Sequence, residues 1–142
     1  METGKHATIT IEATVHAPVE KVWSDWNEPQ HITKWCAASD DWHAPKAEND
    51  LRVGGRFTTR MEAKDGSFGF DFGGVYDEVK VNESISYTMD DGRKVAITFI
   101  RQDNDTKVIE AFEAETTNSL EMQQAGWQAI LDNFKKYSES AN

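Results

Sequence analysis

Glu110 is the residue of this chain whose position in the sequence most clearly predicts chemistry. It lies in a segment of alternating apolar residues that is typical of a strand. If Asn104 and Asp105 form a two-residue turn, Glu110 lies opposite Phe99 and faces the apolar side of the sheet. Burial raises the pKa of a carboxyl group, so Glu110 could then act as a general base or bind a ligand hydroxyl or amine.

A three-residue turn at the same place would reverse this arrangement. Ile109 and Ala111 would then face the core, and Glu110 would face water. In that case replacing Glu110 with Gln should leave ligand binding unchanged. The sequence alone leaves both interpretations open.

Metal, cofactor and covalent chemistry have little basis in this sequence. The single cysteine, Cys36, cannot form an internal disulfide and lacks the spacing of a zinc site, so we interpret it as a small buried residue beside Trp35. The histidines show no metal-ligand spacing either; they are His6, His16, His31 and His43. No nucleophile motif, phosphate-binding loop or dinucleotide fingerprint occurs. We expect no metal and no cofactor.

Charge and length narrow the classes of partner. The 142 residues predict one domain, residues 1–142, and include 15 Lys and Arg against 25 Asp and Glu, a formal net charge of −10. Nucleic acid and anionic membrane surfaces would repel such a chain. No apolar run is long enough to span a membrane, and the first ten residues lack a signal peptide pattern. We therefore expect a cytoplasmic protein.

The first part of the chain predicts one strand and two short helices. Apolar residues alternate over residues 7–15, which indicates a half-buried strand. Pro18 and Pro29 each stand at the first position of a predicted short helix. Residues 37–50 show no clean period and are interpreted as a loop or an irregular edge strand.

Short antiparallel strands follow. Asp65-Gly66 predicts a hairpin that pairs Met61 with Phe70, and a β-bulge is expected at Gly73-Gly74, where the apolar phase changes. The next hairpin, from strand 85–89 to strand 95–99, requires a loop of odd length with a left-handed glycine.

A long amphipathic helix comes last. Asn118 and Glu121 resemble a capping pair at its start, and its apolar residues recur at helical spacing as far as Tyr137. Gly126 within it costs about 1 kcal/mol relative to Ala, so close packing or room for a ligand should compensate, and packing is the favoured reason. The order of elements predicts an α+β fold in which a curved antiparallel sheet wraps around this helix.

Several segments together resemble one known family. They are residues 17–23, Trp35, residues 54–57, residues 74–79 and residues 126–131. In this order they resemble the family named for the activator of the heat-shock-protein-90 ATPase, within the START-like, or SRPBCC, superfamily. The resemblance implies the helix-grip fold, with an apolar cavity between the sheet and the C-terminal helix in which relatives bind lipids, sterols, polyketides and other hydrophobic molecules.

The leading functional hypothesis is binding of a hydrophobic or aromatic small molecule in that cavity. Trp42 and His43 are expected at the pocket mouth. The expected lining comprises Trp35, Phe57, Met61, Phe70, Phe72, Tyr87, Ile97, Phe99, Glu110 and Phe112. The opposing interpretation is that these side chains fill one another's space as a dry core.

Two further hypotheses come from other classes. The resemblance implies a chaperone-associated or stress-response accessory protein, with a chaperone as partner. A cyclase or aromatase-type enzyme would need Glu110, Tyr87 or Arg60 to point into the cavity, and the predicted polar face of Arg60 argues against it. We favour binding without catalysis, and a homodimer is compatible with the sequence.

Overall fold

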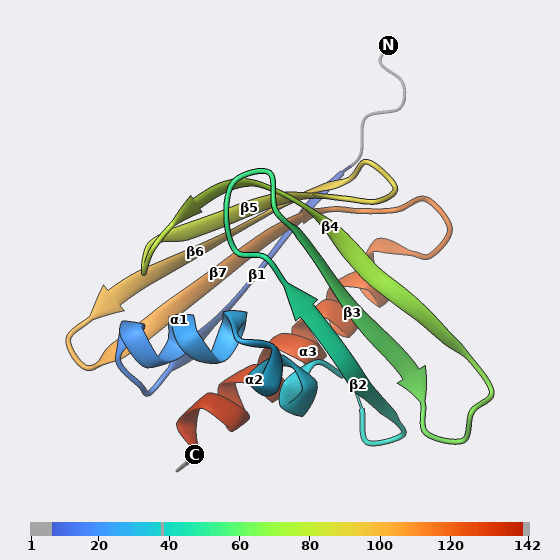
Figure 1. Ribbon diagram of the computed structural model, residues 1–142, viewed down its shortest axis with the longest axis horizontal. Coiled ribbons are helices and arrows are strands. Elements are labelled where there is room, and N and C mark those ends of the chain that lie inside the picture. The colour runs from blue at the N-terminus through green and yellow to red at the C-terminus, as the bar shows by residue number, and fades with distance from the viewer. Residues whose placement is uncertain (1–6, 38, 141–142) are drawn as a thin grey trace.

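A curled antiparallel sheet forms one layer of the molecule, and three helices lie against its concave face (Figure 1). The computed structural model describes residues 7–37 and 39–140. The strands are β1 (Thr8–Val15), β2 (Trp42–Asn49), β3 (Arg56–Ala63), β4 (Gly69–Lys80), β5 (Ser84–Met89), β6 (Lys94–Gln102) and β7 (Asp105–Glu113). The helices are α1 (Val19–Asn27), α2 (Pro29–Trp35) and α3 (Leu120–Glu139). This is the α+β helix-grip arrangement that the sequence predicts.

The seven strands follow the order β1-β7-β6-β5-β4-β3-β2, and every neighbouring pair is antiparallel. From β3 to β7 each strand therefore pairs with the next one in sequence through a short connection. The segment expected to be a loop or an irregular edge strand is the edge strand β2, with a register shift between His43 and Lys46.

The hairpin from β3 to β4 has the predicted register. Met61 pairs with Phe70 and Thr59 pairs with Phe72. Gly66 adopts a φ of 79°, which the chain needs to reverse direction there. The loop between β5 and β6 also matches its prediction, because it holds three residues and ends in Gly92 with a φ of 93°.

The expected β-bulge at Gly73-Gly74 is wrong. Pairing of β4 with β3 runs without interruption through both glycines, and the register of β4 shifts instead against β5, between Tyr76 and Glu78. Tyr76 is consequently buried and Val75 is exposed, the reverse of the expected phase. The apolar phase changes at Asp77, so the bend lies a few residues later than the glycines suggested.

Helix starts depend on single residues. Pro29 occupies the first turn of α2, as expected, while Pro18 is the residue just before α1 rather than its first member. The predicted capping pair of α3 is wrong by one residue: Ser119 caps the helix, and its hydroxyl oxygen accepts a hydrogen bond from the backbone N–H of Met122. Asn118 instead hydrogen-bonds to Glu115.

A buried ionic group holds α1 against α3. The carboxylate of Asp25 accepts hydrogen bonds from Lys21 Nζ at 2.6 Å and from Ser138 Oγ at 2.8 Å, and Asp25 is only 3% exposed. Lys21 Nζ also donates to the carbonyl oxygen of Ser138. A buried carboxylate needs such partners to offset the loss of hydration, so these bonds fix where the end of α3 sits.

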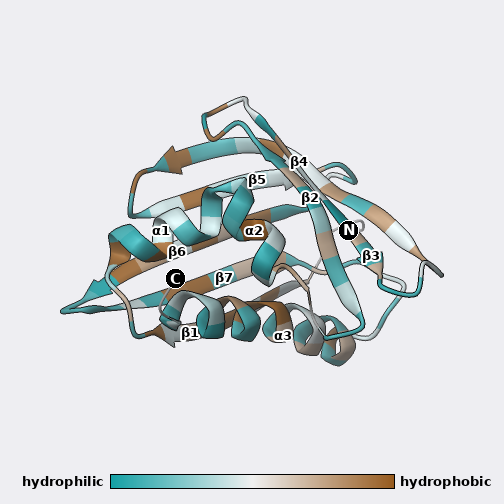
Figure 2. Cartoon of the chain, turned by 60° about the horizontal axis from the view of Figure 1, so that its bottom comes forward, coloured by the Kyte–Doolittle hydropathy of each residue, from teal (hydrophilic) through white to brown (hydrophobic). Residues whose placement is uncertain are grey.

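The core and the helices share the concave face of the sheet. In Figure 2 hydrophobic and hydrophilic residues alternate along the strands, and α1, α2 and α3 lie over that face. Helix α3 runs beside β1, to which Gln128 and Lys135 hydrogen-bond. Near its C-terminal end, Phe134 is fully buried, and its ring meets those of Trp26 and Trp35 edge-on. This aromatic group closes one end of the space between sheet and helix.

Gly126 in the middle of α3 has room around it, contrary to the expected close packing. A Cβ atom built there meets no heavy atom within 4 Å. Gln123 and Ile130 lie one turn away on either side along the same helix face. The cost of a helical glycine is therefore not offset by a tight contact.

We expect Gly126→Ala to stabilise the protein by about 1 kcal/mol, since alanine has the higher helix propensity and its methyl group meets open space. Urea unfolding followed by circular dichroism measures the change. Ala125→Gly, at the exposed neighbouring position, is the matched control and should cost a similar amount. A loss of stability in Gly126→Ala would show that the helix packs more tightly here than described.

Candidate functional site

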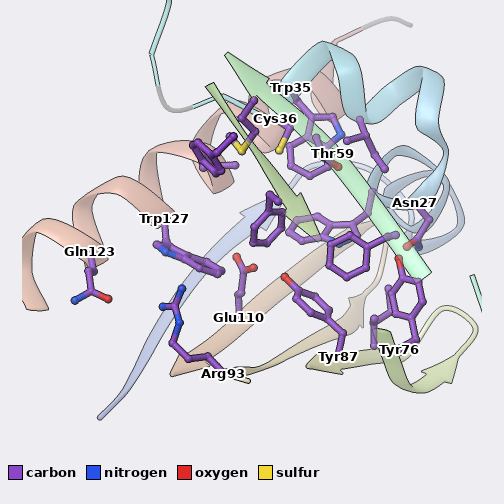
Figure 3. Close-up of a pocket in the computed structure, with 18 of the residues that line it drawn as sticks. Asn27, Trp35, Cys36, Thr59, Tyr76, Tyr87, Arg93, Glu110, Gln123 and Trp127 are labelled. Carbon is purple, nitrogen blue, oxygen red and sulfur yellow. The ribbon is translucent and has the colours of Figure 1, made fainter. Parts of the chain in front are cut away.

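A cavity of about 300 Å³ lies between the concave face of the sheet and α3 (Figure 3). Most of its wall is apolar. Strands β3, β4 and β5 contribute aromatic side chains, α3 contributes Trp127 and Ile130, and the short helices contribute Trp26, Ile32 and Trp35. The dry-core interpretation therefore does not describe this part of the molecule.

Seven of the ten residues expected in the lining are brought together there. They are Trp35, Phe57, Met61, Phe70, Phe72, Tyr87 and Glu110. The alternating pattern of β3 and β4 puts their apolar residues on one face, and the register of the hairpin aligns them. Phe57 also packs against Phe72, Tyr76 and Tyr87, with ring centroids 5.7, 5.3 and 4.7 Å away.

The other three expected residues belong to the core instead. Phe112 is fully buried beneath the indole of Trp127, with centroids 3.9 Å apart and an interplanar angle of 7°. Phe99 packs against Trp23 and Trp26. Ile97 is fully buried in the middle of the sheet. Helix side chains cover Phe99 and Phe112, and the strand pattern alone gives no sign of that cover.

Trp42 and His43, expected at the pocket mouth, are not among the residues that line the cavity itself. Both line a separate surface hollow together with residues of α2 and the end of α3. Trp42 contacts the rings of Phe68 and Phe70 at 6.0 and 6.1 Å, and Phe70 lines the cavity. Trp35 and Cys36 line both the hollow and the cavity. His43 Nε2 lies 3.8 Å from a carboxylate oxygen of Glu62.

Glu110 faces the cavity because the turn between β6 and β7 has two residues, Asp103 and Asn104. Asp103 adopts a φ of 59°, in the left-handed region that such a turn requires. Glu110 then lies opposite Ile97, not Phe99 as expected, but on the same apolar face. Its side chain is among the cavity-lining groups, and the residue is 6% exposed.

Burial alone raises the pKa of Glu110 to about 8. Within the part of the chain that the structure describes, its carboxyl group makes no hydrogen bond or ion pair. Tyr87, also 6% exposed, makes none through its hydroxyl group, and burial together with Glu110 raises its pKa well above the usual value. Both groups therefore carry their protons at neutral pH.

Cys36 also lines the cavity, and its thiol is not poised as a nucleophile. Burial, with a contribution from Glu110, raises the pKa of Cys36 to about 12. A protonated, buried thiol is a weak nucleophile and a poor metal ligand. Among residues 7–37 and 39–140, no group of three or more His, Cys, Asp or Glu side chains is arranged to hold a metal ion.

Sequence reasoning missed several lining residues. Trp26 and Trp127 lie on apolar stripes of the predicted helices and were not expected in the lining, yet each borders the cavity. Gln123, Glu115 and Arg93 form a polar end near the start of α3. A helix stripe that faces a curved sheet can line a cavity as well as a core, and the sequence does not show which.

We expect the stability of the wild-type protein to fall, relative to Glu110→Gln, as pH rises. The pKa of Glu110 is raised from 4.5 in the unfolded chain to about 8 in the fold, so its contribution is fully present below pH 4.5 and is lost as pH passes through 8. Between about pH 5 and about pH 9 the difference in the free energy of unfolding between the wild type and Glu110→Gln should change by on the order of 4 kcal/mol.

Urea unfolding of both proteins across this pH range measures the effect. Glu83→Gln, at an exposed position, is the matched control and should follow the wild type. A constant difference between wild type and Glu110→Gln at all pH values would mean that Glu110 titrates normally and is in contact with water.

No helix in the described part of the chain is both long enough and apolar enough to cross a membrane. The comparison with curated proteins found no match. Solved structures match over nearly the whole chain. An AHSA1-like protein from Aeromonas hydrophila is 50% identical, with a TM-score of 0.89 over 95% of this chain and 94% of that one. A protein from Cytophaga hutchinsonii is 60% identical, with a TM-score of 0.81 over 93% and 92% of the two chains.

A more distant protein, from Chromobacterium violaceum, is 26% identical with a TM-score of 0.84 over 94% of this chain and 97% of that chain. The family model described as Activator of Hsp90 ATPase homolog 1-like protein matches residues 16–139. This match spans the short helices, the strands from β2 to β7 and α3, which are the elements that enclose the cavity. The chain therefore belongs to the family of Activator of Hsp90 ATPase homolog 1-like proteins.

Proposed function

We propose that this protein binds a small hydrophobic or aromatic molecule in the cavity between the sheet and α3. The observation that carries the proposal is the cavity itself, about 300 Å³ of space walled mainly by aromatic side chains. A well-packed core leaves few voids larger than a water molecule, so a space of this size needs a reason. Binding sites for small molecules have this apolar character with a few polar groups.

The size and shape of the wall favour a compact ligand. A volume of 300 Å³ is at the small end of the range for ligand pockets, roughly 300–1,000 Å³. Rings of Phe57, Phe72, Tyr87 and Trp127 present both faces and edges. Flat ring systems gain from offset and edge-to-face contacts with such rings. One or two fused rings therefore suit the cavity better than a long acyl chain.

We expect indane, indole or naphthalene to bind with a Kd of about 1 mM or tighter, because each places an apolar ring in an aromatic cavity. Nuclear magnetic resonance of the tryptophan indole N–H groups follows binding, and Trp26, Trp35 and Trp127 should shift. Ile130→Phe, which adds volume at the cavity wall, should weaken binding at least tenfold.

Met122→Phe, an exposed substitution on the same helix, is the control and should bind like the wild type. The proposal fails if none of the three ring compounds shifts any indole signal of the cavity. It fails too if Ile130→Phe binds the ring compounds as tightly as the wild type and the Met122→Phe control do.

Association with a chaperone is a second candidate, drawn from the family description. The specific observation is an aromatic group at the end of the hairpin from β3 to β4, formed by the exposed rings of Phe68 and Phe70 and the partly buried ring of Trp42 on β2. Phe68 is 62% exposed, and aromatic side chains gathered on a surface are typical of protein contacts.

If this group contacts a chaperone, adding the protein to the Hsp90 homologue of the same cell should raise its ATPase rate, and Phe68→Ser should lose most of the increase. Val81→Ser, at a similarly exposed apolar position outside the aromatic group, is the control and should keep the increase. An ATPase rate that the wild type leaves unchanged would remove this candidate.

A further inference from the structure

The polar groups of the cavity fall into two sets, and only one of them is satisfied within the protein. Tyr76 donates its hydroxyl hydrogen to Asn49, and Trp35 Nε1 donates to the carbonyl oxygen of Asp25. Arg93 donates to Asp91 and to the carbonyl oxygen of Glu113. These groups have their hydrogen bonds without a ligand.

Gln123 belongs to the same satisfied set. Its side-chain oxygen accepts from the backbone N–H of Glu115, and its amide nitrogen donates to the carbonyl oxygens of Glu115 and Asn118. Gln123 therefore ties the start of α3 to the end of β7. The polar end of the cavity is held together by bonds within the protein.

Thr59 belongs to the other set, because it is a buried residue of the cavity wall whose hydroxyl group has no hydrogen-bond partner among the described residues, and so do Glu110 and Tyr87. Both are buried, both line the cavity, and within the described residues neither the carboxyl group nor the hydroxyl group has a hydrogen-bond partner. Leaving a buried polar group unpaired is costly, because the group loses its hydrogen bonds to water and gains none in return. A ligand atom that pairs with both groups would recover that free energy, so the pair marks where a polar atom of the ligand would sit.

The fold aims the two groups at the same space. Glu110 on β7 pairs with Ile97 on β6, which pairs with Ile85 on β5. Tyr87 follows Ile85 by two residues and so lies on the same face of the sheet. Its longer side chain reaches toward the middle of the cavity, and Figure 3 shows its hydroxyl group and the carboxyl group of Glu110 directed into the same region.

The surroundings favour hydrogen-bond donation by both groups. Arg93, the cationic side chain of the lining, is already engaged by Asp91, so it does not hold Glu110 in the charged form. A carboxylic acid kept neutral by an apolar site can donate a hydrogen bond, as a tyrosine hydroxyl can. A carbonyl oxygen, with two lone pairs and no proton of its own, accepts from both.

We infer that the cavity selects ligands that carry a carbonyl group, whose oxygen accepts hydrogen bonds from the Tyr87 hydroxyl and the Glu110 carboxyl group together. This inference rests on the proposed binding function and names its ligand class: a compact ring ketone, aldehyde or quinone. The apolar rings of the cavity hold the hydrocarbon part, and the donor pair fixes its orientation.

Four compounds with one carbon skeleton test the inference: indane, indanone, indanol and aminoindane. Calorimetric titration should give indanone at least tenfold tighter binding than indane, since only indanone can accept the two hydrogen bonds. The infrared carbonyl band of bound indanone should lie below its position in a non-hydrogen-bonding solvent.

Variants test whether the preference for indanone over indane depends on Tyr87 and Glu110. Tyr87→Phe and Glu110→Met should each lower the affinity for indanone about fivefold to tenfold and leave that for indane unchanged. Glu110→Gln keeps an N–H donor and should retain most of the preference. Tyr137→Phe and Glu83→Gln remove the same kinds of group outside the cavity and should match the wild type.

The outcomes separate the two proposals. If indane and indanone bind equally well to the wild type, the carbonyl inference is overturned while the binding function stands. The carbonyl inference is also overturned if aminoindane binds most tightly of the four compounds and its binding releases a proton, as titrations in two buffers would show. Glu110 would then bind the ligand as an anion. If no compound binds, the binding function itself fails. Should a variant not fold, the wild-type affinity ratio and the carbonyl band decide alone.

Discussion

The pairing register of β6 and β7 is the constraint on which the cavity depends. The turn at Asp103 and Asn104 fixes it, and a slip of one residue would turn every side chain of β7 to the opposite face of the sheet. Val108 and Phe112, both fully buried, would then be exposed. The hydrophobic cost of that change holds the register in place, and Glu110, which alternates with them, is carried inward as a consequence.

Aromatic packing decides how much of the enclosed space is core and how much is cavity. Phe112 stacks under Trp127, and Phe134 is enclosed by Trp26 and Trp35. These contacts fill the space next to β7 and at the end of α3. Toward β3 and β4 the rings of the strands contact one another, and Phe72 contacts Trp127 of α3, yet about 300 Å³ of space remains between them. The cavity is the part of the interior that the helix and strand side chains border but do not fill.

Much of this arrangement could be predicted from the sequence, because it depends on local patterns. Alternation of apolar residues and the Asp65-Gly66 turn were enough to pair Met61 with Phe70. Features that depend on two elements at once were not predictable in this way. The bend of β4 lies at Asp77 because of its pairing with β5, although the glycines nearby are the stronger local signal. Ser119 was missed as the cap because Asn118, beside it, is an equally good capping residue.

The same distinction applies to the site. Side chains alternate between the two faces of a strand, so this period of two predicts which residues face inward. The alternation correctly placed Phe57, Phe72 and Tyr87 in the cavity wall. Which of the inward residues touch the cavity depends on α1 and α3, as Phe99 and Phe112 demonstrate. The orientation of Glu110 needed the length of one turn, and two lengths fitted the sequence equally well.

Strand β2 has a consequence for how molecules of this protein meet in solution. It is an edge of the sheet, and its outer backbone groups could in principle template pairing with an extended segment of another molecule. Pro45 has no N–H to donate, Lys46 places a charge beside it, and the register shift between His43 and Lys46 interrupts the straight run of the strand. The edge is thus poorly suited to continuous strand addition, which protects an open, curled sheet from edge-to-edge aggregation.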